Sequence, residues 1–451
     1  MFFKECELTD EQIEYLTQEL IASMSLKEKI RLLNGNWDLV ANIGRLRKGD
    51  SSKPVTIKGI RRLKIKPINY SNGSRGIASG INTCFPVAVA RGASFDIELE
   101  KQIGEVIGIE ARAGGITVFG GVCINLLRNP LWGRSQETYG EDPYHVGVFG
   151  KSLIEGVQSH NVMAGIKYFA LNNQETTRYH GNVEIDERTL REVYLSHFKT
   201  CIDSGAAVVI GASKKVRGEQ ACESKYLLTK VLRDDWGFEG FVLSDFLFGI
   251  RDTKKAIEAG LDVEMPMPIH YERQLMKMVK SGDILEKTVD QAARRVLQTL
   301  LVFRNSKEKR IYPKNLIART SHIQLAREAA EKSMVLVKNE NGILPFSKAC
   351  KKVLLIGSLG FNQNIGDYGS CRVQPPYVVT PVDGLQQYFD DSVEIICCHE
   401  DNVEEAKVLA GSVDAVVIMA GSDGRDEGES LLPDEDSIGK KGMIKLLAKG
   451  Y

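Results

Sequence analysis

Hydrophobic and polar positions follow two alternating periods between residues 67 and 303. Short apolar runs, typical of buried parallel strands, alternate with stretches whose apolar residues recur every three to four positions, as on an amphipathic helix. The runs predict strands at 116–119, 162–169, 207–211, 241–245 and 261–265. The helical stretches are 148–158, 225–234, 252–259 and 289–303. This alternation predicts an α/β fold with a parallel sheet, and the number of βα units favours a (β/α)8-type TIM-like barrel.

Polar residues mark where several of the helices should begin. Ser25 followed by Glu28 is a capping box, which predicts a short second helix after one that begins near residue 10. Asp96 and Asp186 each precede an amphipathic stretch and are predicted N-caps. Residues 36–66 are polar and predict irregular structure.

A second α/β pattern follows a charged, proline-containing stretch. It predicts strands at 334–338, 353–357, 393–397 and 415–421, and helices at 322–332, 403–410 and around 442–448. So few strands predict an open, incomplete α/β sandwich. We therefore expect a barrel domain over residues 1–304, a linker over 305–320 and a truncated sandwich domain over 321–451.

Composition excludes several classes of partner. Lys plus Arg equals Asp plus Glu, at 59 each in 451 residues, which argues against nucleic acid or an acidic membrane as an obligatory partner. The sequence predicts neither a signal peptide nor a membrane span, because the N-terminus is charged and long apolar runs are absent. Nine cysteines without metal-like CxxC spacing predict reduced thiols in a cytoplasmic protein.

Candidate chemistry first arises at the polar pair Ser244 and Asp245. It directly follows the apolar run 241–243, and the carboxyl ends of barrel strands face the substrate. Asp245 is thus a candidate catalytic carboxylate. The alternative is that it caps the following helix, because Asp is common at strand-to-helix turns.

Several separate stretches resemble glycoside hydrolase family 3, which includes many retaining β-glucosidases. The resemblance covers roughly residues 20 to 440 in the family's order. The matching stretches are Asn129–Pro143, Lys167–Arg178, Asp186–Tyr194, Trp236–Asp245, Ala259–Pro266, Gly366–Ser370, Pro375–Pro381 and Asp426–Glu429. The resemblance implies a barrel followed by an α/β sandwich. In the family, the sandwich normally continues beyond the point matched by Tyr451.

The resemblance also implies a retaining mechanism with two carboxylates, which needs them roughly 5–5.5 Å apart. Asp245 matches the family's nucleophile and Glu427 its acid/base on a loop of the second domain. Taken alone, Glu427 would be a solvated loop acid, because Asp426 and Glu429 flank it and Glu is usually exposed. Glu429 is the alternative acid/base.

Further sugar contacts follow from the resemblance, and some depart from the family pattern. Arg128 and Lys167 match substrate-binding residues, and Arg134 matches a loop-shaping one. Three expected groups have changed: the family's Asp is Asn72, its His is Tyr168 and its Tyr is Ser213. Lys214 and Arg217 replace neutral residues nearby and add positive charge. The changes predict either a pocket for an unusual or anionic sugar, or a decaying gene.

The resemblance implies hydrolysis of terminal β-glycosides, with β-glucosides the expected case, and an oligosaccharide or glycoside as the partner. The two-carboxylate mechanism needs no metal and no organic cofactor. One alternative is a non-catalytic carbohydrate-binding relic of the fold. A second is a barrel lyase or aldolase with Lys167 as a Schiff base, which would leave the Ser-Asp strand and the second domain without a role.

Overall fold

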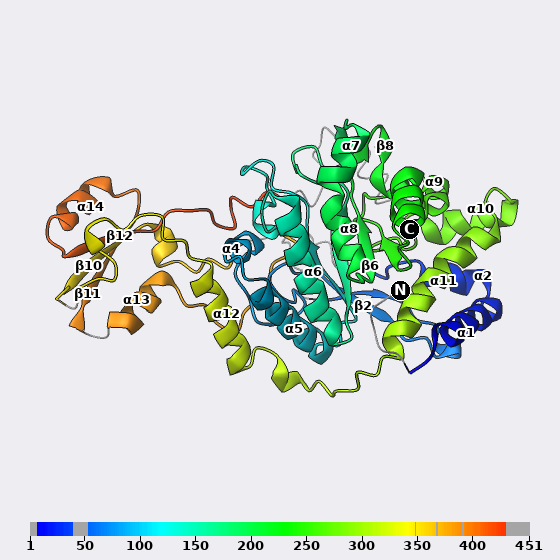
Figure 1. Cartoon of the computed structure of the whole chain (residues 1–451), viewed down its shortest axis with the longest axis horizontal. Coiled ribbons are helices and arrows are strands. Elements are labelled where there is room, and N and C mark those ends of the chain that lie inside the picture. The colour runs from blue at the N-terminus through cyan, green and yellow to red at the C-terminus, as the bar shows by residue number, and fades with distance from the viewer. Residues whose placement is uncertain (1–6, 39–52, 348, 367–368, 390–391, 430–451) are drawn as a thin grey trace.

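The computed structural model describes residues 7–38, 53–347, 349–366, 369–389 and 392–429. Figure 1 shows a large N-terminal domain and a smaller α/β unit at one end of the long axis. The predicted helix around 442–448 lies outside the described residues. Within the described part of the chain, no helix is both long and apolar enough to span a membrane.

The N-terminal domain is organised around one six-stranded sheet, in the order β1-β2-β3-β4-β6-β9. Neighbouring strands are parallel except for β1 and β2, which are antiparallel. Residues of β3, β4, β6 and β9 are all buried, as expected when helices cover both faces of a parallel sheet. The strands are β1 Val55–Ile57, β2 Ile68–Ser71, β3 Val118–Cys123, β4 Met163–Phe169, β6 Val208–Gly211 and β9 Phe241–Leu243.

Backbone pairing continues from one edge of this sheet to the other through isolated bridges. Leu243 of β9 pairs with Val263, Glu264 pairs with Asn34, and Gly35 pairs with Ile57 of β1. The predicted strand at 261–265 thus makes single bridges instead of a ladder. Pro266 follows directly and has no amide to donate, which limits further pairing. The large sheet of the described domain therefore has six regular strands and bridged edges, instead of the eight regular strands expected of a (β/α)8 barrel. A separate small sheet contains β5 Asn182–Val183, β7 Lys215–Val216 and β8 Glu219–Gln220.

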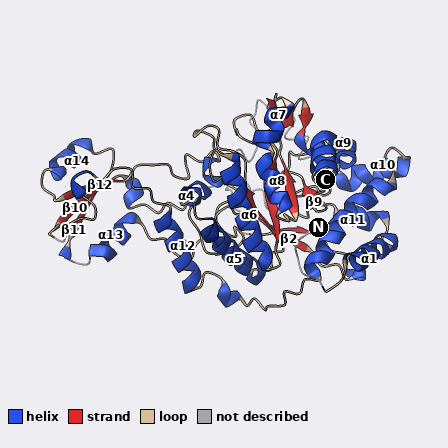
Figure 2. Cartoon of the chain, in the orientation of Figure 1, coloured by secondary structure: helices blue, strands red, loops and turns tan. Residues whose placement is uncertain are grey.

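Helices surround the sheet (Figure 2). The capping box of Ser25 and Glu28 is confirmed, and the side chains of Asp96 and Asp186 accept the expected backbone N–H bonds. The helix predicted after Asp186 is interrupted by a π-helical turn at Leu190–Tyr194, and the one at 225–234 is π-helical over Tyr226–Asp235. The main helices are α1 Asp10–Ser23, α2 Leu26–Leu32, α5 Ile97–Ala113, α6 Pro143–Ser159, α8 Ser196–Asp203, α9 Thr253–Ala259, α10 Met276–Ser281 and α11 Glu286–Arg304.

The smaller unit has a three-stranded parallel sheet in the order β11-β10-β12. Its strands are β10 Lys352–Ile356, β11 Glu394–Cys398 and β12 Ala415–Ile418, with helices α13 Pro381–Phe389 and α14 Val403–Ala410. The strand predicted at 334–338 is wrong. Met334 to Val337 lie in irregular, exposed chain because they pair with none of the described strands.

Helix α12, Thr320–Lys332, packs against α4 (Ala88–Ala93) and α5 of the N-terminal domain. The domain boundaries at 304 and 321 stay predictions. Two loops of the smaller unit also reach the N-terminal domain. Gln374 bridges to Ile81, and the N–H of Gly428 donates to the carbonyl of Gly133 over 2.9 Å. These loops bring residues of both parts to the same end of the large sheet.

His197 on α8 provides a test of the core. Burial lowers its pKa to about 3, whereas an unfolded histidine titrates near ~6.5. The folded protein therefore binds fewer protons between these values, and its free energy of unfolding should fall as pH drops below ~6.5. The loss is about 1.4 kcal/mol per pH unit.

We expect His197→Leu to remove about 2 kcal/mol of the difference in unfolding free energy between pH 7 and pH 5, measured in urea. His180→Gln is the control, because His180 is exposed and its replacement should leave the pH dependence unchanged. An unaltered pH slope in His197→Leu would contradict this account of α8.

Candidate active site

Asp245 lies at the end of β9 and is 2% exposed. Its carboxylate accepts hydrogen bonds from Nη2 of Arg178 at 2.9 and 3.1 Å, from the Ser213 hydroxyl at 2.5 Å and from the Phe246 N–H at 2.8 Å. The next helix, α9, is capped by Asp252 instead. The N-cap alternative for Asp245 is therefore wrong, and Asp245 is a buried carboxylate held by an arginine.

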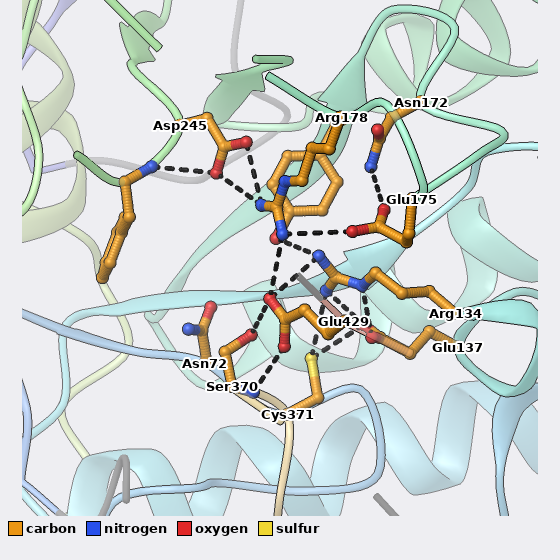
Figure 3. Close-up of polar contacts among 12 residues, drawn as sticks. Asn72, Arg134, Glu137, Asn172, Glu175, Arg178, Asp245, Ser370, Cys371 and Glu429 are labelled. Atoms are coloured by element: carbon orange, nitrogen blue, oxygen red, sulfur yellow. Dashed lines mark hydrogen bonds and ion pairs between the residues drawn. The ribbon is translucent and has the colours of Figure 1, made fainter. Parts of the chain in front are cut away.

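Arg178 connects three carboxylates (Figure 3). Besides Asp245, its Nη1 lies 3.3 Å from Glu175 and 3.4 Å from Glu429. Arg178 and all three acids have side chains at least 96% buried. One guanidinium group therefore spans Asp245 of the large sheet and an acid of the smaller unit.

Arg134 forms the second cationic centre. It pairs with Glu137 at 2.6 Å and Glu429 at 3.1 Å and donates to the Tyr168 hydroxyl at 3.0 Å. Burial alone would raise the pKa of Glu137, but the ion pair with Arg134 outweighs it and lowers that pKa to about 2. Arg134 thus connects Glu137 of its own loop with Glu429 of the smaller unit.

Lys167 and Tyr168 end β4 beside this network. Lys167 is fully buried and its Nζ donates to Asn72 Oδ1 over 3.3 Å, while the Tyr70 hydroxyl donates to the same oxygen over 2.6 Å. The Tyr168 ring lies within 4.8–5.5 Å of the cations of Arg134, Lys167 and Arg178. Asn72, Lys167, Tyr168 and Ser213 are therefore brought together with Asp245.

Arg128 is not brought into this cluster. It is exposed, and its guanidinium lies 6.0 Å from the ring of Tyr194. Arg217 also points elsewhere, pairing with Glu187 at 2.8 Å. Lys214 is buried, and burial lowers its pKa to about 8. Of the two added cations, only Lys214 lies near the site, where Glu175 and Arg178 influence its charge.

The two candidate acid/bases lie on the loop after β12. The Glu429 carboxylate accepts the Ser370 N–H at 2.5 Å and its hydroxyl at 2.9 Å, in addition to its two arginine contacts. Glu427 is partly buried, and its Oε1 accepts the Glu429 N–H at 3.2 Å. Carboxylate oxygens of Glu137, Glu427 and Glu429 all lie within 4.8 Å of one another.

Two overlapping clusters have the donor atoms for a metal ion. One contains Cys123, Glu137 and Cys371, and the other Glu137, Glu427 and Glu429. Cationic side chains already occupy these groups: Arg134 pairs with both Glu137 and Glu429. Lys167 donates to Cys371 Sγ at 3.5 Å. Their positive charges oppose a divalent cation at either cluster.

Sequence reasoning gave no role to Arg178, Glu175, Ser370 or Cys371. Arg178 lies in a loop rich in polar residues, where no hydrophobic period marks a buried position. The signal for it was available only as the terminal Arg of the matched stretch 167–178. Ser370 and Cys371 come from the smaller unit, so their place at the site depends on how the two parts dock.

The carboxylates and arginines lie at the strand ends of one α/β domain, and loops of a second α/β unit add further acids. This is the architecture of a two-domain glycoside hydrolase. The chain belongs to glycosyl hydrolase family 3. The model of the family's N-terminal domain matches residues 54–299, and that of its C-terminal domain matches residues 334–447.

Curated relatives of the chain carry β-glucosidase names. Beta-glucosidase B of Emericella nidulans is 35% identical over 387 residues, covering 84% of this chain and 44% of the relative. Thermostable beta-glucosidase B of Acetivibrio thermocellus is 32% identical over 454 residues, covering 93% of this chain and 57% of the relative. The chain thus spans about half the length of these relatives.

Solved structures of β-glucosidases also superpose on this chain. The Bifidobacterium adolescentis GH3 beta-glucosidase superposes with a TM-score of 0.79 at 27% identity, covering 95% of this chain and 62% of that one. Beta-glucosidase 3B of Thermotoga neapolitana, in complex with α-D-glucose, gives a TM-score of 0.76 at 27% identity, covering 88% and 56%.

Proposed function

We propose that this chain hydrolyses terminal β-glycosides, β-glucosides first among them, with retention of configuration. The observation that carries the proposal is the joining of Asp245 and the 427–429 loop across Arg178. This arrangement brings a strand-end carboxylate and acids of the second unit to one place, as a double displacement requires. The β-glucosidase names of the relatives support the substrate class.

Asp245 is the proposed nucleophile. It would attack the anomeric carbon and form a glycosyl-enzyme, which water then hydrolyses. Hydrogen bonds from Arg178, Ser213 and the Phe246 N–H fix the position of its carboxylate. Because Arg178 covers the carboxylate, a bound sugar must displace this guanidinium from Asp245.

Glu427 is the proposed acid/base. The carboxylate of Glu429 is already engaged by two arginines. Glu427 lies against the carboxylates of Glu137 and Glu429, on the loop that reaches the Asp245 network. Glu427 is partly exposed, so a leaving group can reach it.

Lys167, Asn72 and Tyr168 are the proposed sugar-binding residues, because their polar atoms lie beside the Asp245 network. Arg134 joins them, and Arg128 leaves the set because of its exposed position. Lys214 adds a partly titrating cation, which favours sugars with an anionic group.

We also interpret the six-stranded sheet with bridged edges as an irregular form of the family's barrel, the smaller unit as part of its sandwich, and the location as cytoplasmic.

Replacing Glu427 with Ala tests the acid/base role. General acid catalysis contributes ~10²–10⁴-fold, so kcat/KM should fall by that factor on alkyl β-glucosides, whose leaving groups need a proton. The loss on dinitrophenyl β-glucoside should stay below about tenfold, because this leaving group departs as an anion. Azide should partly restore turnover of the variant.

Glu141→Ala is the matched control, because Glu141 is exposed on another loop and its loss should leave both rates unchanged. If Glu427→Ala lost activity equally on both substrates and azide had no effect, the acid/base role would move to Glu429.

A non-catalytic carbohydrate-binding protein is the second candidate. The specific observation in its favour is that Asp245, Arg178 and Glu429 satisfy one another in a closed, buried network. Isothermal titration with cellobiose, run alongside an assay of glucose release, distinguishes the two. Binding without any release would favour the second candidate.

A further inference from the structure

Two cysteines from different parts of the fold meet beside the candidate active site. Cys123 is the last residue of β3, and Cys371 lies on the loop of the smaller unit that follows β10. Both thiols donate to the same oxygen, Glu137 Oε2, at 3.1 and 2.8 Å. Their sulfur atoms lie within 4.8 Å of each other, and both residues are buried.

The surroundings of Cys371 favour its thiolate. Lys167 Nζ donates to its sulfur at 3.5 Å and Arg134 Nη2 at 3.8 Å. The hydrogen bond from Cys123 lowers the pKa of Cys371, whereas burial raises the pKa of Cys123. A cysteine with a lowered pKa beside cations, with a second thiol in reach, has the electrostatic features of an oxidisable cysteine and its resolving partner. Both thiols are buried, so a small oxidant such as peroxide is the reagent that the site can admit.

We propose that Cys123 and Cys371 are a peroxide-sensitive pair that oxidises to a disulfide bond between the N-terminal domain and the smaller unit. The Cys371 thiolate attacks one peroxide oxygen, the O–O bond breaks, and Cys371 becomes a sulfenic acid as the first water leaves. The Cys123 sulfur then attacks the Cys371 sulfur. This forms the S–S bond and releases the sulfenic oxygen as a second water, with the proton from Cys123.

The bond would fix the loop that holds the candidate acids. Ser370 adjoins Cys371 and binds both oxygens of Glu429 through its N–H and hydroxyl. The disulfide bond would also connect residues 248 positions apart by their numbering. A cross-link across so long a segment strongly restricts the unfolded chain. Oxidation should therefore stabilise the docking of residues 369–374 on the large sheet.

The test uses the purified full chain, first reduced and then treated with a small excess of hydrogen peroxide. After free thiols are blocked by alkylation, peptide mapping should find Cys123 joined to Cys371, and the intact mass should fall by two hydrogen atoms. Thioredoxin or dithiothreitol should reverse both changes. The oxidised protein should unfold at a higher urea concentration than the reduced one.

Cys371→Ser and Cys123→Ser keep a hydroxyl for Glu137 and should fold, but neither should form the cross-link or gain stability on oxidation. Cys201→Ser is the matched control, because Cys201 is buried on α8 away from the pair, and it should behave like the parent. A mass increase from sulfinic acid at Cys371, a bond between Cys371 and Lys167, or stoichiometric zinc binding that needs both cysteines would each overturn the proposal.

Discussion

Asp245→Asn is expected to lower kcat for aryl β-glucosides by about 10³-fold or more, because removing a covalent nucleophile removes the whole double displacement. Asn has nearly the same shape and keeps one oxygen that accepts hydrogen bonds, and Glu175 and Glu429 still pair with Arg178, so the fold should persist. Initial rates on nitrophenyl β-glucoside, with unfolding curves for both proteins, make the comparison.

Asp252→Asn is the matched control for this change. Asp252 lies seven positions along the chain and caps α9 on the surface, so its replacement should leave kcat unchanged and cost about 1 kcal/mol or less of stability. Wild-type turnover in a folded Asp245→Asn protein would mean that another group forms the covalent intermediate, or that none forms.

Arg178→Met is expected to cause the largest loss of stability. It removes a buried cation from Asp245, Glu175 and Glu429 and leaves their carboxylates without that partner. Breaking a buried ion pair in this way costs about 3–5 kcal/mol. The free energy of unfolding in urea measures the loss, and Arg188→Met, an exposed site with a side chain 84% accessible, should change it by less than about 1 kcal/mol.

A second substitution separates charge from packing. If the cost comes from an unpaired Asp245, then adding Asp245→Asn to Arg178→Met should restore part of the stability, with a coupling of about 1–3 kcal/mol. Strictly additive losses would show that Arg178 acts through packing, and the electrostatic description of the site would be wrong.

Local signals predicted local structure well. The Ser25 capping box, the Asp96 cap and the bounds of α14 follow from short-range hydrogen bonding and period, and all three are confirmed. The run at 334–338 had the composition of a strand, but a strand exists only where a neighbour pairs with it. Its exposed, unpaired state could not be predicted from those residues alone.

Some residues of the candidate site could be predicted from local signals, and others could not. Asn72, Ser213 and Asp245 follow β2, β6 and β9, and Lys167 and Tyr168 lie near the end of β4. The carboxyl ends of these neighbouring parallel strands converge. Arg128 and Arg178 both lie in loops, where the chain gives no period to read. The family match favoured Arg128, yet the buried ion pairs put Arg178 beside Asp245. Long-range docking, which brings Cys371 and Glu429 from the smaller unit, left no local signature.

The most direct test of the central claim is covalent trapping with dinitrophenyl 2-deoxy-2-fluoro-β-glucoside. The fluorine slows hydrolysis of a glycosyl-enzyme, so a retaining enzyme accumulates it. We predict one fluoroglucosyl group per chain, on the peptide that contains Asp245, with a burst of dinitrophenol of equal amount. A label on Glu427, Glu429 or another peptide would contradict the account, as would steady hydrolysis of β-glucosides by a protein that never acquires the label.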